Sequence, residues 1–151
     1  GMVLAICNPN IEFTLMDSVG KKTKFLESIK NLLALKNVEV INGRAEDFIK
    51  DRRETYDLGL CRGVNRLNVI LEYVIPFIKE KGIFFPQKLE YINEVDEAKN
   101  ALEILNCSLE EVIESKLPYS KAERIILKIR KNAKTDNKYP RRAGVALKKP
   151  L

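Results

Sequence analysis

The chain contains 151 residues with a formal net charge of +6, and 45% of its residues are hydrophobic and 32% charged. This composition is typical of a soluble globular protein with one core. No apolar run approaches the ~20 residues that a transmembrane helix requires. The first residues also lack the basic and apolar blocks of a signal peptide. We therefore expect a cytoplasmic protein that does not bind a membrane.

The cysteine and histidine content narrows the chemistry. The three cysteines are scattered without a CxxC pair, and the chain contains no histidine. This pattern argues against a disulfide framework and suits a reducing compartment. It also excludes histidine-based catalytic triads and histidine-ligated metals. We expect no metal cofactor.

The positive charge is concentrated near the C-terminus. From Lys131 onward there are seven basic residues and one acidic residue, whereas residues 1–130 hold 20 of each. We predict a folded domain over residues 1–130 and a basic tail over residues 131–151 that packs on it or extends from it. A localised positive patch is typical of proteins that bind phosphate-rich partners. A solvated tail fits the charge equally well.

Strand and helix patterns alternate in the first half of the chain. Apolar residues at alternate positions predict strands, and apolar residues at helical spacing predict helices. In chain order we predict a helix over residues 1–8, a strand over 11–16, a helix over 18–35, a strand over 38–41 and a short helix over 45–50. The long helix should be capped by Ser18 and should bury an apolar stripe made of Phe25, Ile29, Leu32 and Leu33.

The second half continues this alternation and then changes. We predict a strand over residues 56–61, a helix from 67 to about 80 kinked by Pro76, a strand over 83–85 and a helix over 90–105. Two apolar runs near residues 109–113 and 125–129 follow with no helix between them. They predict an antiparallel strand pair that closes the sheet. Together the elements predict an α/β fold whose sheet is mostly parallel and is covered by helices on both faces.

Ligands of such sheets bind at the carboxyl ends of the strands. Asp17 follows the first predicted strand, where one carboxylate could accept hydrogen bonds from both hydroxyls of a ribose. A helix cap is the alternative role for this acid. The segment 43–47 follows the next strand, and its backbone at Ala45 and Glu46 could read an adenine. Its alternative is an ordinary glycine turn that enters a helix.

Basic residues follow the later strands. Arg62 and Lys88 stand just beyond two apolar strands, so each requires a carboxylate or a ligand as its partner. In the tail, Arg141 and Arg142 lie between Pro140 and Gly144, which suits contacts to phosphate. A salt bridge that anchors the tail to the surface is the alternative.

Several segments taken together resemble one family. LMDSVGKKTKFL, VEVINGRAEDF, YDLGLCRGV, LPYSKAERIILKIRK and KYPRRAGVALKKPL occur in this order and span nearly the whole chain. They are similar to the glucose-inhibited division protein B family. Members of that family are S-adenosylmethionine-dependent methyltransferases that modify a guanine N7 in bacterial small-subunit ribosomal RNA.

The resemblance implies a Rossmann-like class I methyltransferase sheet and roles for individual residues. The implied cofactor is S-adenosylmethionine, and the implied partner is small-subunit ribosomal RNA. By resemblance the cofactor-binding residues are Asp17, Ser18, Ala45, Glu46 and Arg62. The residues expected to face the RNA are Lys21, Lys22, Lys88, Arg124, Arg141 and Arg142. The resemblance assigns no catalytic residue and no oligomeric state.

The chain departs from the family pattern in three places. The segment 61–67 keeps the arginine of the family's SRAVAPL pattern but not its proline, and Gln87-Lys88-Leu89 replaces an expected lysine-glycine pair. The family's first strand and its glycine-rich GxGxGxPG turn have no counterpart here. We expect a truncated member in which the strands next to the missing one lack a partner or pair with each other, and cofactor affinity is impaired. A non-catalytic RNA-binding remnant is one alternative, and an NAD-dependent oxidoreductase is another.

Overall fold

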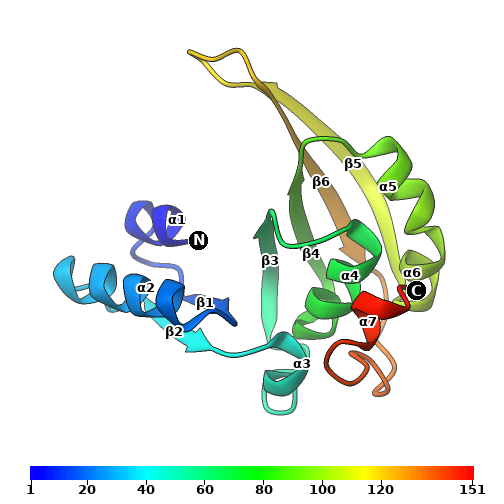
Figure 1. Cartoon of the computed structure of the whole chain (residues 1–151), viewed down its shortest axis with the longest axis horizontal. Coiled ribbons are helices and arrows are strands. Elements are labelled where there is room, and N and C mark those ends of the chain that lie inside the picture. The colour runs from blue at the N-terminus through cyan, green and yellow to red at the C-terminus, as the bar shows by residue number, and fades with distance from the viewer. The chain divides into compact units, whose positions relative to one another are not determined.

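The six strands form two sheets, and helices lie between the strands along the chain (Figure 1). Each of two compact units contains one sheet. The computed structural model describes every residue from 1 to 151. One unit comprises Gly1–Phe48 and the other Ile49–Leu151. The predicted α/β class is confirmed, with parallel strand pairs in both units and an antiparallel pair at the end of the chain.

The first unit is built on two parallel strands. Along the chain, the strands alternate with helices in the order α1 (Met2–Cys7), β1 (Phe13–Asp17), α2 (Gly20–Leu32), β2 (Val38–Asn42) and α3 (Ala45–Phe48). The side-chain amide of Asn37 is buried and donates to the carbonyl oxygens of Ala5, Asn8 and Ile11 at 3.0–3.2 Å. This residue therefore ties the end of α1 and the chain leading into β1 to the start of β2. In the register of the strands, Asp17 lies opposite Asn42.

The predicted apolar stripe of α2 is wrong for three of its four residues. Phe25, Leu32 and Leu33 are 64%, 79% and 48% exposed, and the buried residue of the helix is Thr23. A two-stranded sheet is narrow, so it covers less of a helix than a full sheet would. The helix also begins later than predicted, because its N-cap is Val19 and not Ser18.

The second unit contains a four-stranded sheet in the order β3-β4-β6-β5. β3 (Tyr56–Arg62) and β4 (Ile78–Lys88) are parallel, whereas β6 (Glu123–Lys131) is antiparallel to both β4 and β5 (Cys107–Lys116). The core lies between the sheet and helices α4 (Leu67–Val74), α5 (Ile92–Glu97) and α6 (Lys99–Ile104), and includes Leu71, Phe84, Leu105, Leu127 and Ile129. Within its own unit, β1 pairs with β2 alone and β3 pairs with β4 alone.

The helix predicted from residue 67 to about 80 ends earlier. α4 stops at Val74, a 3-10 turn η1 (Ile75–Phe77) contains Pro76, and β4 begins at Ile78. Proline lacks the N–H that a continuing helix needs. Tyr56 lies opposite Ile78 but Leu58 lies opposite Ile83, so extra residues of β4 leave the ladder as a bulge.

The predicted helix over residues 90–105 is broken at Ala98. The break separates α5 from α6, and the Ala98 side chain is fully buried. Both short helices pack on α4.

The basic C-terminal segment folds within the second unit and ends in α7 (Val145–Lys148). Tyr139 and Ala146 are buried. The Tyr139–Pro140 peptide bond is cis. Across the whole chain, no helix has the length and apolar character needed to cross a bilayer.

Candidate functional site

The first candidate site lies at the carboxyl ends of β1 and β2, within the first unit. Asp17 is the last residue of β1, and its side chain is 29% exposed. Its Oδ1 accepts the N–H of Val19 at 2.9 Å, and its Oδ2 lies 3.2 Å from Nζ of Lys22. The carboxylate, rather than Ser18, therefore holds the chain as it enters α2. Ser18, Lys21 and Lys22 are exposed.

The segment after β2 is joined directly to Asp17. The carbonyl oxygen of Asp17 accepts the N–H of Gly43 at 3.1 Å and Nδ2 of Asn42 at 3.3 Å. Ala45 and Glu46 then begin α3. The structure thus brings the predicted ribose-binding residue and the predicted adenine-reading segment to adjacent strand ends.

The Phe48 ring packs closely on Gly43 at this junction. A Cβ atom there would lie 2.1 Å from Cε2 of Phe48, so even alanine would displace the Phe48 ring. Asp47 and Phe48 donate their N–H groups to the carbonyl oxygen of Arg44 at 3.1 Å and 3.3 Å. These contacts set the direction in which the backbone at Ala45 and Glu46 leaves the strand.

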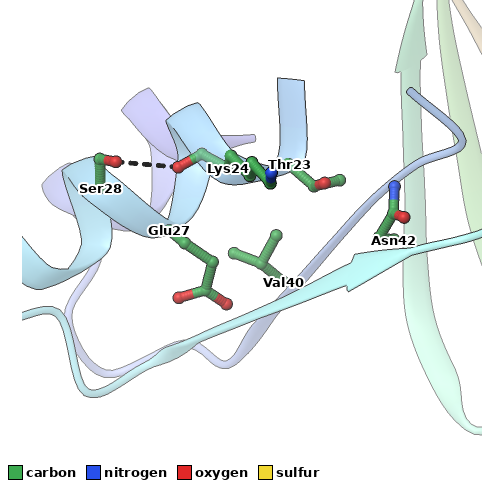
Figure 2. Close-up of a pocket in the computed structure, with 6 residues that line it drawn as sticks. All are labelled: Thr23, Lys24, Glu27, Ser28, Val40 and Asn42. Carbon is green, nitrogen blue, oxygen red and sulfur yellow. Dashed lines mark hydrogen bonds between the residues drawn. The ribbon is translucent and has the colours of Figure 1, made fainter. Parts of the chain in front are cut away.

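A depression of about 560 Å³ between α2 and β2 does not include the predicted residues. Its lining comprises Thr23, Lys24, Glu27, Ser28, Val40 and Asn42 (Figure 2). The hydroxyls of Thr23 and Ser28 donate to carbonyl oxygens of their own helix at 3.0 Å and 2.9 Å. Asn42 is already bonded to Asp17. The polar groups here stabilise local structure and do not converge on a ligand.

The second candidate site is a cavity of about 540 Å³ at the carboxyl ends of β3 and β4, within the second unit. Arg62 ends β3 and lies opposite Gln87 of β4. Three of the predicted basic residues line this one cavity, namely Arg62, Lys88 and Arg124. Arg62 is exposed, and Nη1 of Arg124 donates to the carbonyl oxygen of Glu123 at 2.7 Å.

Lys88 is held by a carboxylate that the sequence did not identify. Its Nζ lies 2.5 Å from Oε2 of Glu94 and 2.7 Å from the carbonyl oxygen of Asn65, and its side chain is 8% exposed. The same Oε2 accepts the N–H of Leu67 at 2.7 Å. This Lys88–Glu94 clasp joins the end of β4 and α5 to the loop after Arg62. The ammonium of Lys88 thus positions the wall of the cavity, and its predicted contact with RNA stays a prediction.

Cys61 also lines this cavity but is not a nucleophile at neutral pH. Burial raises the pKa of its thiol to about 12, although the nearby charge of Lys88 acts in the opposite direction. The thiolate, which is the reactive form, is therefore scarce.

The two tail arginines differ in their surroundings. Arg141 binds the fully buried carboxylate of Glu72 and also donates to the carbonyl oxygen of Lys149, whereas Arg142 is exposed. Hydrogen bonding to Glu72 raises the pKa of Arg141. The contact is the tail anchor that the sequence left open as an alternative. A role of Arg141 at RNA remains untested.

Sequence reasoning missed both acidic partners, Glu72 and Glu94. A signal was available for Glu72, because it is the one charged residue of the mostly apolar helix α4, where the structure buries it completely. A buried charge requires a partner. Glu94 is one of three acidic residues on α5, together with Asp96 and Glu97, so its charge does not stand out in the sequence.

The family comparison covers most of the chain. The profile described as rRNA small subunit methyltransferase G (GidB) matches residues 1–127. The ribosomal RNA small subunit methyltransferase G of Fusobacterium nucleatum subsp. nucleatum is 60% identical over 151 residues, which are 100% of this chain and 65% of that protein. The protein of the same name from Acetivibrio thermocellus is 39% identical over 153 residues, which cover 100% of this chain and 63% of that protein. The chain thus spans just under two thirds of the length of these relatives.

Solved structures support the same fold at low sequence identity. A variant of the 16S rRNA (adenine(1408)-N(1))-methyltransferase of Catenulisporales acidiphilia superposes with a TM-score of 0.72 and 11% identity, over 89% of this chain and 80% of that one. M. jannaschii TYW2 in complex with AdoMet gives a TM-score of 0.67 and 16% identity, over 86% and 63%. At this low identity the two neighbours show the fold alone. The oxidoreductase alternative is abandoned because the family profile and the named relatives are those of a methyltransferase family. The profile match over residues 1–127 places this chain in the rRNA small subunit methyltransferase G family.

Proposed function

We propose that this chain supplies the ribose and adenine side of the cofactor site, and part of the RNA surface, of an S-adenosylmethionine-dependent methyltransferase. The proposed target is a guanine N7 in small-subunit ribosomal RNA. The observation that carries the proposal is the junction of Asp17 with Gly43, which brings two cofactor-type strand ends together within a chain of this family.

The groups around Asp17 fit the ribose of this cofactor. An exposed carboxylate oxygen at the end of a parallel strand can accept from ribose hydroxyls. Lys22 is 66% exposed and long, so it can leave Oδ2 without disturbing the fold. Asp17 and Ser18 would hold the ribose, and the backbone at Ala45 and Glu46 would contact the adenine.

The chemistry requires positioning more than acid or base catalysis. When bound, S-adenosylmethionine supplies a methyl group that its sulfonium already activates. Guanine N7 carries a free lone pair, so no proton has to be removed before it reacts. The chain's own residues would therefore act by orienting the RNA. Arg124 lines the second cavity, where its guanidinium can hold a phosphate of the RNA, and Arg62 in the same lining is the arginine that the resemblance assigns to the cofactor.

Cofactor binding to the 151-residue chain tests the first part of the proposal. Asp17→Asn should weaken S-adenosylmethionine binding roughly 10- to 100-fold, because hydrogen bonds to a charged acceptor are lost. Asp96→Asn is the matched control, since Asp96 is an exposed acid paired with Lys99 on another helix. Equal affinity of the Asp17 variant and the wild-type chain in calorimetry would refute the assigned role.

Methyl transfer tests the second part. The chain would be incubated with labelled S-adenosylmethionine and purified small-subunit RNA, and sites of N7-methylguanosine would be mapped by reduction and aniline cleavage. One cleaved guanine supports the proposal. RNA binding without cofactor binding or methylation would instead support the non-catalytic RNA-binding alternative.

A further inference from the structure

The hairpin formed by β5 and β6 extends beyond the rest of its sheet. The β4–β6 ladder ends at the pair Lys88 and Ile125, whereas the β5–β6 ladder continues to Lys116 and Glu123. The hairpin tip, residues 117–122, is consequently supported by its own two strands. Figure 1 shows it projecting from the four-stranded sheet.

The tip exposes an aromatic ring completely. Tyr119 is 100% exposed, and Leu117 beside it is 38% exposed. Turns usually use small or polar residues, whose side chains bond to the local backbone. A fully solvated ring contributes nothing to the core of this chain. It offers a flat apolar face to a partner instead.

The tip holds this ring on an ordered turn. The N–H of Leu117 donates to the carbonyl oxygen of Ala122 at 3.0 Å, and the N–H of Lys121 donates to the carbonyl oxygen of Leu117 at 3.0 Å. The hydroxyl of Ser120 accepts the N–H of Ala122 at 3.3 Å. Binding through a turn that is already ordered costs less conformational entropy than binding through a flexible loop.

The charges near the tip favour a polyanion. Lys116 and Glu123 lie 3.5 Å apart and compensate each other. Lys121 in the turn and Arg124 at the start of β6 add two positive charges and exposed Glu114 of β5 one negative charge, so residues 114–124 carry a net charge of +1. Arg124 also lines the cavity at the ends of β3 and β4, so the positive groups run from the tip to that cavity.

We infer that the hairpin tip is a contact site for unpaired RNA, in which an exposed base stacks on Tyr119 and Lys121 faces the neighbouring phosphate. Every base has a flat π-face, and aromatic side chains are the common platform for unpaired nucleotides. The inference rests on the proposed function for the identity of the polymer. The position of Arg124 indicates that the same strand would run on toward the cavity.

The absence of tryptophan makes a direct optical test possible. Tyr119→Trp creates a chain with one tryptophan at the tip, and stacking of a base should quench its fluorescence when small-subunit RNA is added. Val3→Trp is the control, because Val3 is 72% exposed on α1, a helix to which no RNA or cofactor residue is assigned. Its fluorescence should not change.

Affinity measurements give a second readout on the full chain. Tyr119→Ala should weaken binding of unpaired RNA roughly 5- to 100-fold, whereas Tyr119→Phe should bind like the wild-type chain, because stacking needs the ring and not the hydroxyl. An RNA duplex of the same length should bind equally to all three proteins. The side chain is fully exposed, so circular dichroism should show unchanged folding.

Three outcomes would overturn the inference. If wild-type affinity for unpaired RNA persists in Tyr119→Ala, or if bound RNA leaves the Tyr119→Trp fluorescence unchanged, the tip contact is absent while the proposed function stands. If the Tyr119→Trp signal responds to assembled subunits but not to their free RNA, the tip contacts a feature of the assembled particle and not unpaired RNA as such. If the wild-type chain retains no RNA on a filter, the proposed RNA substrate fails as well.

Discussion

The guanidinium of Arg141 lies against the carboxylate of Glu72, with Nη2 2.6 Å from Oε2 and Nε 2.9 Å from Oε1. The backbone N–H of Arg141 donates to the same Oε1 at 2.7 Å. Glu72 is fully buried in α4, so its charge depends on a residue 69 positions later in the chain. This pair attaches the basic C-terminal segment to the core.

Arg141→Ala should therefore destabilise the fold by about 3–5 kcal/mol, because it leaves a buried carboxylate without its counter-charge. Arg142→Ala, the neighbouring control at an exposed position, should change the free energy of unfolding by less than about 0.5 kcal/mol. Urea unfolding of the two variants measures the difference. Equal losses would show that the Glu72 contact does not stabilise the protein.

The same two variants separate anchoring from RNA binding. Arg142→Ala should lower RNA affinity and reduce the dependence of that affinity on salt, because it removes a cation that can contact phosphate. The measurement is a filter-binding titration at several salt concentrations. An unchanged salt dependence in Arg142→Ala would remove this residue from the RNA surface.

The Lys88–Glu94 clasp predicts a local effect near the second cavity. Glu94→Gln leaves the buried ammonium of Lys88 without its counter-charge and weakens the acceptor of the Leu67 N–H. Amide hydrogen exchange at Leu67 should therefore accelerate, together with loss of stability of about 3 kcal/mol. Glu97→Gln on the same helix is the control, since its partner Arg66 is largely exposed. Unchanged exchange at Leu67 in Glu94→Gln would contradict the clasp.

The ion pair between Lys131 and Glu54 should make the free energy of unfolding fall in acid. The fully buried Nζ of Lys131 lies 2.7 Å from Oε1 of Glu54 and 2.8 Å from the carbonyl oxygen of Ile78. Burial opposes ionisation of Glu54, but hydrogen bonds from Lys131 and Thr135 outweigh it and lower the pKa of Glu54. A lowered pKa means that this stabilisation is complete above pH 4.5 and is lost as pH falls through the folded-state pKa.

Glu54→Gln should accordingly flatten the acid side of the stability curve, which unfolding experiments between pH 3 and pH 6 would measure. Lys131→Met should cost about 3–5 kcal/mol at neutral pH, because Glu54 and two backbone carbonyls lose their donor. Exposed Lys50→Met serves as the control. A Glu54→Gln variant with the wild-type acid dependence would refute the assignment.

The raised pKa values of two thiols should make the free energy of unfolding fall at alkaline pH. Burial raises the pKa of Cys61 and of Cys107 from 9.0 to about 12. The folded protein therefore keeps both thiols protonated at a pH where the unfolded chain loses those protons. Their stabilisation is complete below pH 9 and is lost as pH rises toward 12.

Thiol reactivity checks this prediction. In the native protein at pH 8, a disulfide reagent should modify exposed Cys7 first, half-buried Cys61 more slowly because its pKa is raised, and buried Cys107 only at the rate of unfolding. Removing one buried thiol with Cys107→Ala should reduce the fall in stability between pH 8 and pH 10.5. Simultaneous rapid modification of all three cysteines would contradict the assigned burial.

Local sequence patterns predicted most elements because they depend on neighbouring residues. Alternating apolar residues identified the strands, and the pair over residues 109–113 and 125–129 was confirmed as antiparallel within β5 and β6. The errors lie where distant contacts decide. Phe77 and Ile78 continue the helical apolar spacing that starts at Leu67, yet Ile78 begins β4, where it pairs with Tyr56 of β3.

The sequence by itself determined the family and the positions of the candidate residues at strand ends, since motif order and strand periodicity are local and collinear. Only the tertiary structure decided what those residues contact. It joined Asp17 to Gly43 and gave Lys88 and Arg141 their partners Glu94 and Glu72. A charge near a strand end requires compensation, but which group provides it depends on packing between segments far apart in the chain.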